Sequence, residues 1–280
     1  MTTESDDLQR ARLLLAGELV PPVARPAATV ALIRDGVAGL EVYLLRRVSA
    51  MAFAAGMHVF PGGSVDPADH GPADHGPVGQ GPVDRGGAEP PVGWVGPAPD
   101  WWAGRFGIDQ ALAQALVGAA VRETFEEAGV LLAGPSADLL VDDISGDEWE
   151  AERVALEAGR QSLSHLLIRR GLRLRADLLA PLAHWITPEI GRKRFDTYFF
   201  VAALPERQIC REVGTEADLR LWISPQEALS SGLRIMPPTQ AVLQDLATHQ
   251  NVASARSAER EITTVLPRFE IHNNHLRLIT

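Results

Sequence analysis

The sequence predicts an α/β fold of the α+β type. Apolar, β-branched segments of strand length recur between Ala27 and Trp222, as expected for strands of a buried sheet. Longer stretches with helical periodicity lie between them, and the clearest of these ends at Gly129. The 280 residues, 46% of them hydrophobic, are enough for one large domain or for a domain with appendages.

The N-terminal part of the chain is expected to contain a short helix and then a pair of strands. Residues 8–19 have the pattern of a short helix, and we expect residues 1–26 to form an N-terminal helix and linker. Residues 27–34 are apolar and β-branched, and residues 40–47 form the strand that returns after the Asp35-Gly36 turn. The pair predicts a β-hairpin that joins a sheet, at the start of a main domain covering residues 27–280.

The longest predicted helix covers residues 108–128, with Asp109 as N-cap and Gly129 as left-handed C-terminal cap. Gly118 and a change of apolar face predict a break at which two helices meet. Residues 137–171 are charged and helical in pattern. We interpret this segment as a helical insertion with no chemistry of its own.

The C-terminal half alternates strands and helices. Strands are expected at residues 172–179, 182–187 and 195–204, of which 195–204 is the plainest central strand, and residues 211–222 lead into another strand. Ser224, Pro225 and Glu227 have the pattern of a capped helix start. A last long helix is expected from the Pro237-Pro238 pair to about residue 248, and an edge strand pair within residues 262–279.

Composition narrows the classes of function. The formal charge of −10 argues against a nucleic-acid partner. The single cysteine, Cys210, excludes an internal disulfide framework and suits a reducing compartment. No apolar run approaches the roughly 20 residues of a membrane helix, and the acidic N-terminus lacks a signal pattern. We expect a soluble cytoplasmic protein without a membrane partner, and a homodimer is left open.

Residues 70–100 differ sharply in composition, with 8 Gly and 7 Pro among 31 residues and recurring pentads such as ADHGP. Such sequence cannot build a core, so we expect a flexible surface insertion. His70 and His75 are then solvated residues of the repeat rather than metal ligands. The Trp101-Trp102 pair either pins the insertion to the body or offers a stacking surface for a base.

Three glutamates, Glu123, Glu126 and Glu127, lie at helical spacings i, i+3 and i+4 and therefore share one helix face. They form either a solvated acidic face or a site for a hard divalent cation, which prefers oxygen ligands. Upstream, the Val59–Gly63 segment VFPGG ends an apolar strand in a turn whose glycines let the backbone approach a ligand closely.

At these residues the chain resembles the Nudix hydrolases. Gly63 matches the first glycine of their signature, and the segment RETFEEAGV from Arg122 to Val130 matches its second half. Asp69 stands where the signature has its first Glu, Thr124 replaces an aliphatic residue, and 52 residues separate Asp69 from Arg122 where the family has about seven.

This resemblance implies an α/β/α sandwich with a mixed central sheet, in which the Gly/Pro-rich segment interrupts the signature. It also implies a Mg²⁺ or Mn²⁺ ion held by Glu123, Glu126, Glu127 and the Gly63 carbonyl, with Arg122 orienting a glutamate and Glu123 acting as general base. A further carboxylate from a loop is expected, and Glu216 or Glu212 could supply it.

Two basic groups are candidate phosphate contacts, because the arginine fork matches phosphate oxygens. Arg46 and Arg47 end the second strand, and Arg192 and Arg194 belong to the densest positive segment of an acidic chain. The alternative for each group is ordinary solvation.

Within the Nudix family the chain is similar to the coenzyme A diphosphatases called nucleoside diphosphate-linked moiety X motif 19. The similarity rests on the FPGG turn, the long insert, RETFEEAGVLL, WITP with RFDTYFF, and WISP. It implies hydrolysis of a nucleoside diphosphate linked to another moiety, with coenzyme A or its acyl esters first. NADH, ADP-ribose and dinucleoside polyphosphates remain open as substrates, as do a non-catalytic nucleotide-binding regulator and a purely structural protein.

Overall fold

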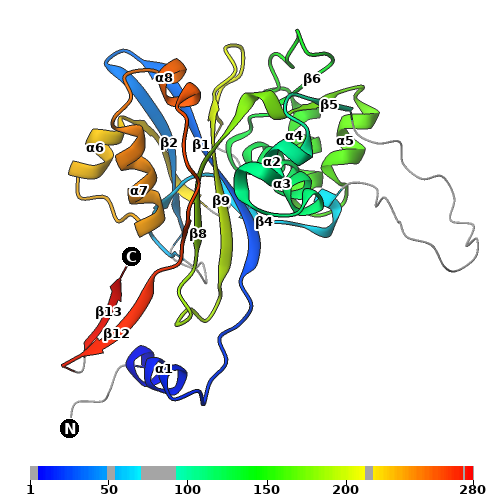
Figure 1. The fold of residues 1–280 in the computed structure, drawn as a ribbon. Coiled ribbons are helices and arrows are strands. Elements are labelled where there is room, and N and C mark those ends of the chain that lie inside the picture. The colour runs from blue at the N-terminus through cyan, green and yellow to red at the C-terminus, as the bar shows by residue number, and fades with distance from the viewer. Residues whose placement is uncertain (1–5, 49–53, 71–92, 212–216, 274, 280) are drawn as a thin grey trace, which may run out of the picture.

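A mixed eight-stranded sheet forms the centre of the protein (Figure 1). The computed structural model describes residues 6–48, 54–70, 93–211, 217–273 and 275–279. The strand order is β10-β2-β1-β9-β8-β11, with β3 added to β2 and β4 added to β1. These strands are β1 (Arg25–Gly36), β2 (Gly39–Arg47), β3 (His58–Val59), β4 (Gly62–Ser64), β8 (Leu179–Ile186), β9 (Phe195–Ala203), β10 (Ala217–Ile223) and β11 (Thr264–Val265).

Helices cover both faces of this sheet (Figure 1). On one side lie α2 (Pro99–Phe106), α3 (Gln110–Ala128), α4 (Asp147–Glu157) and α5 (Leu163–Arg169), and on the other lie α6 (Pro225–Ser230), α7 (Pro237–Leu246) and α8 (Val252–Ser257). The predicted α/β/α sandwich with a mixed sheet is therefore confirmed.

The sheet has a hydrophobic core on each face, because the side chains of a strand point alternately to the two faces. In β1, Val30 and Leu32 join the core under α3, whereas Ala31 and Ile33 join the core under α7. The neighbouring β9 is parallel to β1 and alternates in the same way. The expected hairpin of β1 with the antiparallel β2 is confirmed, and β9 lies in the middle of the sheet as predicted.

Helix α3 begins and ends where the sequence predicts. The Asp109 carboxylate accepts the N–H of Leu112 at 2.9 Å, and Gly129 has φ 66° with its N–H bonded to the Phe125 carbonyl. The predicted break at Gly118 is wrong, since α3 is one continuous helix. A Cβ at Gly118 would lie 3.1 Å from the Asp69 carbonyl oxygen. Glycine at this position therefore allows the backbone of Asp69 to pack closely against α3.

Several other boundaries differ from the predicted ones. The segment expected as a strand at residues 172–179 is the short β7 (Arg173–Arg175) and a 3₁₀ turn, η2 (Ala176–Leu178). Strand β7 joins β5 (Gly93–Val95) and β6 (Ala133–Gly134) in a separate small sheet. The helix expected to reach residue 248 ends at Leu246, and α8 after it was not predicted. The capped start of α6 is confirmed, because the Ser224 side chain accepts the N–H of Glu227.

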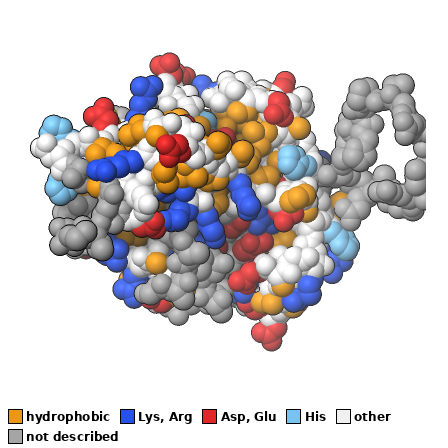
Figure 2. Space-filling view, turned by 90° about the horizontal axis from the view of Figure 1, so that it is seen from below, with side chains coloured by type: hydrophobic (Ala, Val, Ile, Leu, Met, Phe, Trp, Pro, Cys, Tyr) orange, Lys and Arg blue, Asp and Glu red, His pale blue; other side chains and the backbone are white. Residues whose placement is uncertain are grey.

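The first helix and the last two strands of the described chain lie near each other at the lower end of Figure 1. Helix α1 (Asp6–Leu15) packs near the hairpin of β12 (Arg268–His272) and β13 (His275–Ile279). This hairpin confirms the expected pairing of two strands at the C-terminal end, but the pair forms a sheet of its own and is not at the edge of the central sheet. Leu15, Leu278 and Ile279 are exposed there, and Figure 2, which looks from this end, shows apolar side chains beside charged ones.

Most of the predicted Gly/Pro-rich insertion, residues 71–92 with His75, lies outside the described residues. Within the described part, the short 3₁₀ helix η1 (Pro67–His70) ends at an exposed His70. Trp102 is fully buried, whereas Trp101 is 44% exposed and contacts it edge-on. In the part of the chain that the structure describes, no helix is both long and apolar enough to cross a bilayer.

Candidate active site

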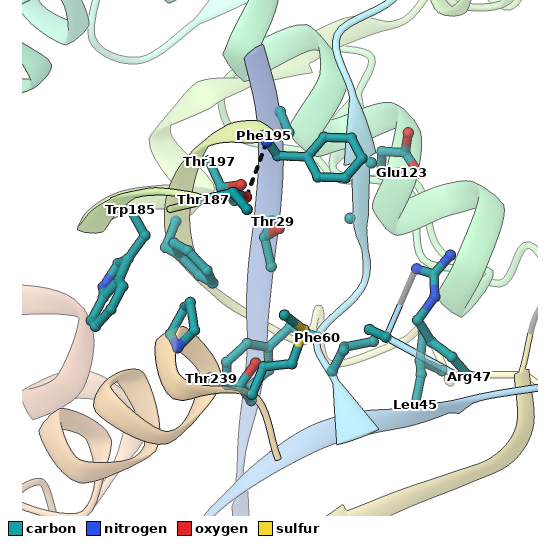
Figure 3. Close-up of a pocket in the computed structure, with 18 of the residues that line it drawn as sticks. Thr29, Leu45, Arg47, Phe60, Glu123, Trp185, Thr187, Phe195, Thr197 and Thr239 are labelled. Carbon is teal, nitrogen blue, oxygen red and sulfur yellow. Dashed lines mark hydrogen bonds between the residues drawn. The ribbon is translucent and has the colours of Figure 1, made fainter. Parts of the chain in front are cut away.

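A cavity of about 550 Å³ opens beside the C-terminal half of α3. One part of it is polar and is lined by Arg47, Gly62, Gly63, Glu123, Glu126, Glu127 and Glu157. The rest is largely apolar and is lined by residues that include Phe60, Trp185, Phe199, Met236, Pro238 and Pro267. Figure 3 places Trp185 across the cavity from Glu123 and Arg47. The cavity therefore joins an acidic end to an aromatic wall.

The three glutamates predicted to share a helix face all reach this cavity. Glu123 is 8% exposed, and the Glu126 side chain is 12% exposed. The opposite face of α3 packs into the core through fully buried Val117, Val121 and Phe125. Because that face fixes the rotation of the helix, the carboxylates are aimed at the cavity and not at open solvent.

Arg122 holds this acidic end together. Its Nε and Nη2 each donate to one oxygen of Asp69 at 2.9 Å, and the Asp69 side chain is only 1% exposed. Its Nη1 donates to Glu123 at 2.8 Å and to Glu126 at 3.2 Å, and Nη2 also donates to the Ser64 carbonyl at 2.9 Å. One guanidinium thus fixes two glutamates on α3, the segment of η1 and the end of the glycine turn.

The glycine turn is tied to the same helix. The N–H of Gly62 donates to Glu127 at 2.8 Å, and β4 pairs with β1 through Gly63 opposite Ala28. A Cβ at Gly63 would lie 2.2 Å from a Glu123 oxygen. Only a residue without a side chain lets the turn and the glutamate approach this closely.

The carboxylates share a strongly negative environment. Burial, followed by the charge of Glu123, raises the pKa of Glu126 to about 7, although Arg122 acts in the opposite direction. Burial alone would lower the pKa of Arg122, but its bond to Asp69 and the charges of Glu123 and Glu126 raise it overall. Arg122 therefore stays cationic, and one guanidinium faces three carboxylates.

This donor set fits a hard divalent cation. Oxygens of Glu123 and Glu126 converge on the same Arg122 nitrogen, and Glu127 lies one residue away, which supplies the oxygen ligands that magnesium and manganese prefer. Among the described residues, no group of three or more potential ligands is already arranged around one point. Arg122 donates to one oxygen each of Glu123 and Glu126, and the Gly62 N–H donates to one oxygen of Glu127.

The predicted phosphate contacts have different surroundings. Arg47 lines the cavity, and Figure 3 shows its side chain rising toward the helix that carries Glu123. Arg46 instead pairs with Asp218 at 2.7 Å on the surface. Arg192 pairs with Asp6 of α1, and Arg194 donates to the carbonyls of Thr187 and Pro22, so neither lies among the residues that line the cavity. The predicted ligand Glu216, like Glu212, lies outside the described residues.

Replacing Gly63 by Ala is expected to lower turnover by at least about tenfold while the protein still folds, because the new methyl group displaces the Glu123 carboxylate and a misplacement of about 1 Å can cost about 100-fold in rate. The new methyl group would meet the flexible end of Glu123, and the backbone at Gly63 is not left-handed. Gly36→Ala is the matched control, since its Cβ would lie 2.4 Å from the Glu41 side chain, far from the cavity. Equal turnover in the two purified variants would contradict the role of Gly63.

The fold and the site together define a class of protein. A mixed sheet between helical layers, with a glycine turn facing the carboxylates of one helix, is the arrangement of a Nudix hydrolase domain. A family model described as the NUDT19 Nudix domain matches residues 10–240, and the chain belongs to this family. The resemblance drawn from the signature residues is thereby confirmed.

Named relatives and a solved structure agree with this assignment. The chain is 29% identical over 234 residues to the acyl-coenzyme A diphosphatase NUDT19 of Gallus gallus, and 31% identical over 233 residues to that of Homo sapiens. Each alignment covers 72% of this chain, and 60% and 59% of the relatives. The chain thus spans about three fifths of their length. A crystal structure of a Nudix hydrolase from Alicyclobacillus acidocaldarius is 29% identical with a TM-score of 0.65, covering 85% of this chain and 98% of that one.

Proposed function

We propose that the protein hydrolyses a phosphoanhydride bond in a nucleoside diphosphate linked to another moiety, with coenzyme A or an acyl-coenzyme A as the first substrate. The observation that carries this proposal is the shape of the cavity, whose acidic end faces the Gly62-Gly63 turn and whose remaining wall is apolar. Coenzyme A has the matching chemistry, with a diphosphate joined to an uncharged pantetheine arm. The curated relatives that bear the name acyl-coenzyme A diphosphatase support the same substrate.

The proposed roles follow from the geometry of the acidic end. A bound Mg²⁺ or Mn²⁺ would neutralise diphosphate oxygens and acidify a water molecule. Glu123, Glu126, Glu127 and the Gly63 carbonyl are the proposed ligands, and Glu123 is also the proposed general base. Arg122 orients Glu123 and Glu126 through its own hydrogen bonds. Arg47 and Arg220 both line the cavity, and Arg47 is the one of the predicted phosphate contacts that is proposed to bind the anionic substrate.

The proposed setting is the cytoplasm, on the grounds of the acidic composition and the single cysteine. We propose a small-molecule substrate rather than nucleic acid, since a net charge of −10 opposes contact with a polyanion. The oligomeric state is a separate question, and sedimentation of the purified protein would distinguish a monomer from a homodimer.

The test is a panel of diphosphates assayed with Mg²⁺, with Mn²⁺ and with a chelator. The panel contains coenzyme A, short and long acyl-coenzyme A esters, NADH, ADP-ribose and dinucleoside polyphosphates. We expect coenzyme A compounds to give 3′,5′-ADP and a 4′-phosphopantetheine product, only when metal is present. If no compound is cleaved but a ligand shifts the melting temperature, the proposed enzymatic function is wrong, and the protein is instead a nucleotide-binding regulator.

A further inference from the structure

Helix α4 belongs to the segment that the sequence predicts to be without chemistry, yet it lies beside the helix that carries the glutamates (Figure 1). Trp149 of α4 meets Phe125 of α3 edge-on, with ring centroids 6.5 Å apart. Phe125 is fully buried on the side of α3 that faces the core. The insertion is therefore docked on the catalytic helix by aromatic packing and is not a separate appendage.

The contact between the two helices centres on Arg153, whose side chain is 3% exposed. Its Nη1 donates to the backbone carbonyl of Glu126 at 2.9 Å and to the Glu157 carboxylate at 2.8 Å. Its Nε and Nη2 hold the Glu150 carboxylate, the closest bond being 2.7 Å. The guanidinium thus joins one residue of the acidic helix face to two acids of the insertion.

The bonded carbonyl is one that a helix cannot satisfy by itself. The last four carbonyls of a helix lack partners within it, and a cation near them is favoured by the helix dipole. The neighbouring Arg211 contacts the same helix end through its backbone, because its backbone N–H donates to the Ala128 carbonyl at 3.0 Å, while its side-chain Nη1 donates to Glu150 at 3.1 Å. Two arginines linked by Glu150 therefore cap the turn of α3 that presents Glu126.

This turn needs such support, since Glu123, Glu126 and Glu127 repel one another on one face. Arg122 relieves the repulsion between the carboxylates, and Arg153 holds the backbone at the Glu126 carbonyl. Glu157, fixed by Arg153, also lines the cavity beside the other acids. Loss of Arg153 would therefore free the helix turn and Glu157 at once.

We propose that Arg153 is a positioning residue of the active site, which fixes the last turn of α3 and thereby the metal-binding geometry of Glu126 and Glu127. Its effect on turnover rests on the proposed function. Its effect on the helix turn is independent of any substrate. Arg153 then acts through the backbone of α3 and not by touching the substrate, and it makes the helical insertion part of the catalytic apparatus.

The test compares Arg153→Met with Arg169→Met. Arg169 belongs to the same insertion and pairs with Glu152 and Gln161, without a bond to α3 among those of the described residues. In metal-free protein, we expect amide hydrogen exchange of residues 125–129 to be faster in Arg153→Met and unchanged in Arg169→Met. We also expect Mn²⁺ affinity, measured by electron paramagnetic resonance, and kcat to fall at least about tenfold for Arg153→Met only, as is typical when a partner of a ligand is removed.

Arg153→Lys keeps the charge and one donor nitrogen, so it should recover part of the Mn²⁺ affinity and provides a folded variant if Arg153→Met fails to fold. Exchange rates and Mn²⁺ affinities that are the same in the Arg153 and Arg169 variants would overturn the proposal. If the wild type cleaves no diphosphate in the panel, the proposed function fails, while the exchange comparison still decides whether Arg153 positions the helix turn.

Discussion

Replacing Glu126 by Gln is expected to reduce turnover by about 100-fold or more, which corresponds to roughly 2.7 kcal/mol of transition-state stabilisation. Gln keeps the shape of the side chain but loses the charge that a divalent cation requires. Glu126 points into the cavity beside Glu123, and both accept hydrogen bonds from Arg122. The substitution therefore removes a proposed metal ligand while leaving its neighbours in place.

The fold of Glu126→Gln should remain intact. Glu126 is repelled by Glu123 in a buried setting, so the loss of its charge relieves repulsion and should not lower the melting temperature of the metal-free protein. Mn²⁺ affinity and kcat are to be measured at matched free metal. Glu148→Gln on the exposed side of α4 is the matched control, because its carboxylate is 70% exposed and pairs with Arg170 at 3.3 Å. If Glu126→Gln has the same turnover as this control, Glu126 is not a metal ligand of the active site.

The parts of the fold that were predictable are those that local chemistry determines. The N-cap at Asp109 and the left-handed C-cap at Gly129 follow from the preferences of single residues, and the structure contains both. The shared face of the glutamates follows from helical spacing alone. Even Thr124, which departs from the family signature, is explained locally, because its hydroxyl donates to the Ala120 carbonyl within α3.

The parts that were missed depend on contacts between distant segments. Gly118 gives a helix-break signal in the sequence, but its real cause is the backbone of Asp69, which approaches α3 across 48 intervening residues. The basic segment with Arg192 and Arg194 has the composition of a phosphate clamp. In the structure Arg192 pairs with Asp6 of α1, and Arg194 donates to the backbone carbonyls of Thr187 and Pro22. Charge density along a sequence does not show which surface the charge will face.

The helical insertion illustrates the same limit for the active site. Nothing in the pattern of residues 137–171 distinguishes Arg153 and Glu157 from the other charges of a solvated helix. Only the docking of α4 on α3 brings Arg153 to the Glu126 carbonyl and Glu157 to the cavity. The apolar wall around Trp185 was missed for a similar reason, since its residues come from strands and loops far apart in the chain.

Replacing Arg122 by Met is expected to lower the free energy of unfolding by roughly 3–5 kcal/mol, the usual cost of removing one partner of a buried ion pair. Asp69 would lose the guanidinium that binds both of its oxygens, and its side chain is almost completely buried. Glu123 and Glu126 would lose the one cation that their carboxylates share in the described structure. The free energy of unfolding should therefore fall by more in Arg122→Met than in a variant that loses one solvent-exposed ion pair.

Urea denaturation of metal-free protein measures this effect, with Glu41→Gln as control. Glu41 pairs with Arg34 at 2.8 Å in a more exposed setting, where such pairs contribute at most about 1 kcal/mol. The double variant Asp69→Asn with Arg122→Met should be more stable than Arg122→Met alone, because no unpaired charge is then left at Asp69. If Arg122→Met costs no more than Glu41→Gln, the Arg122 cluster does not hold the glycine turn, η1 and the acidic face of α3 together, and the site needs a different structural basis.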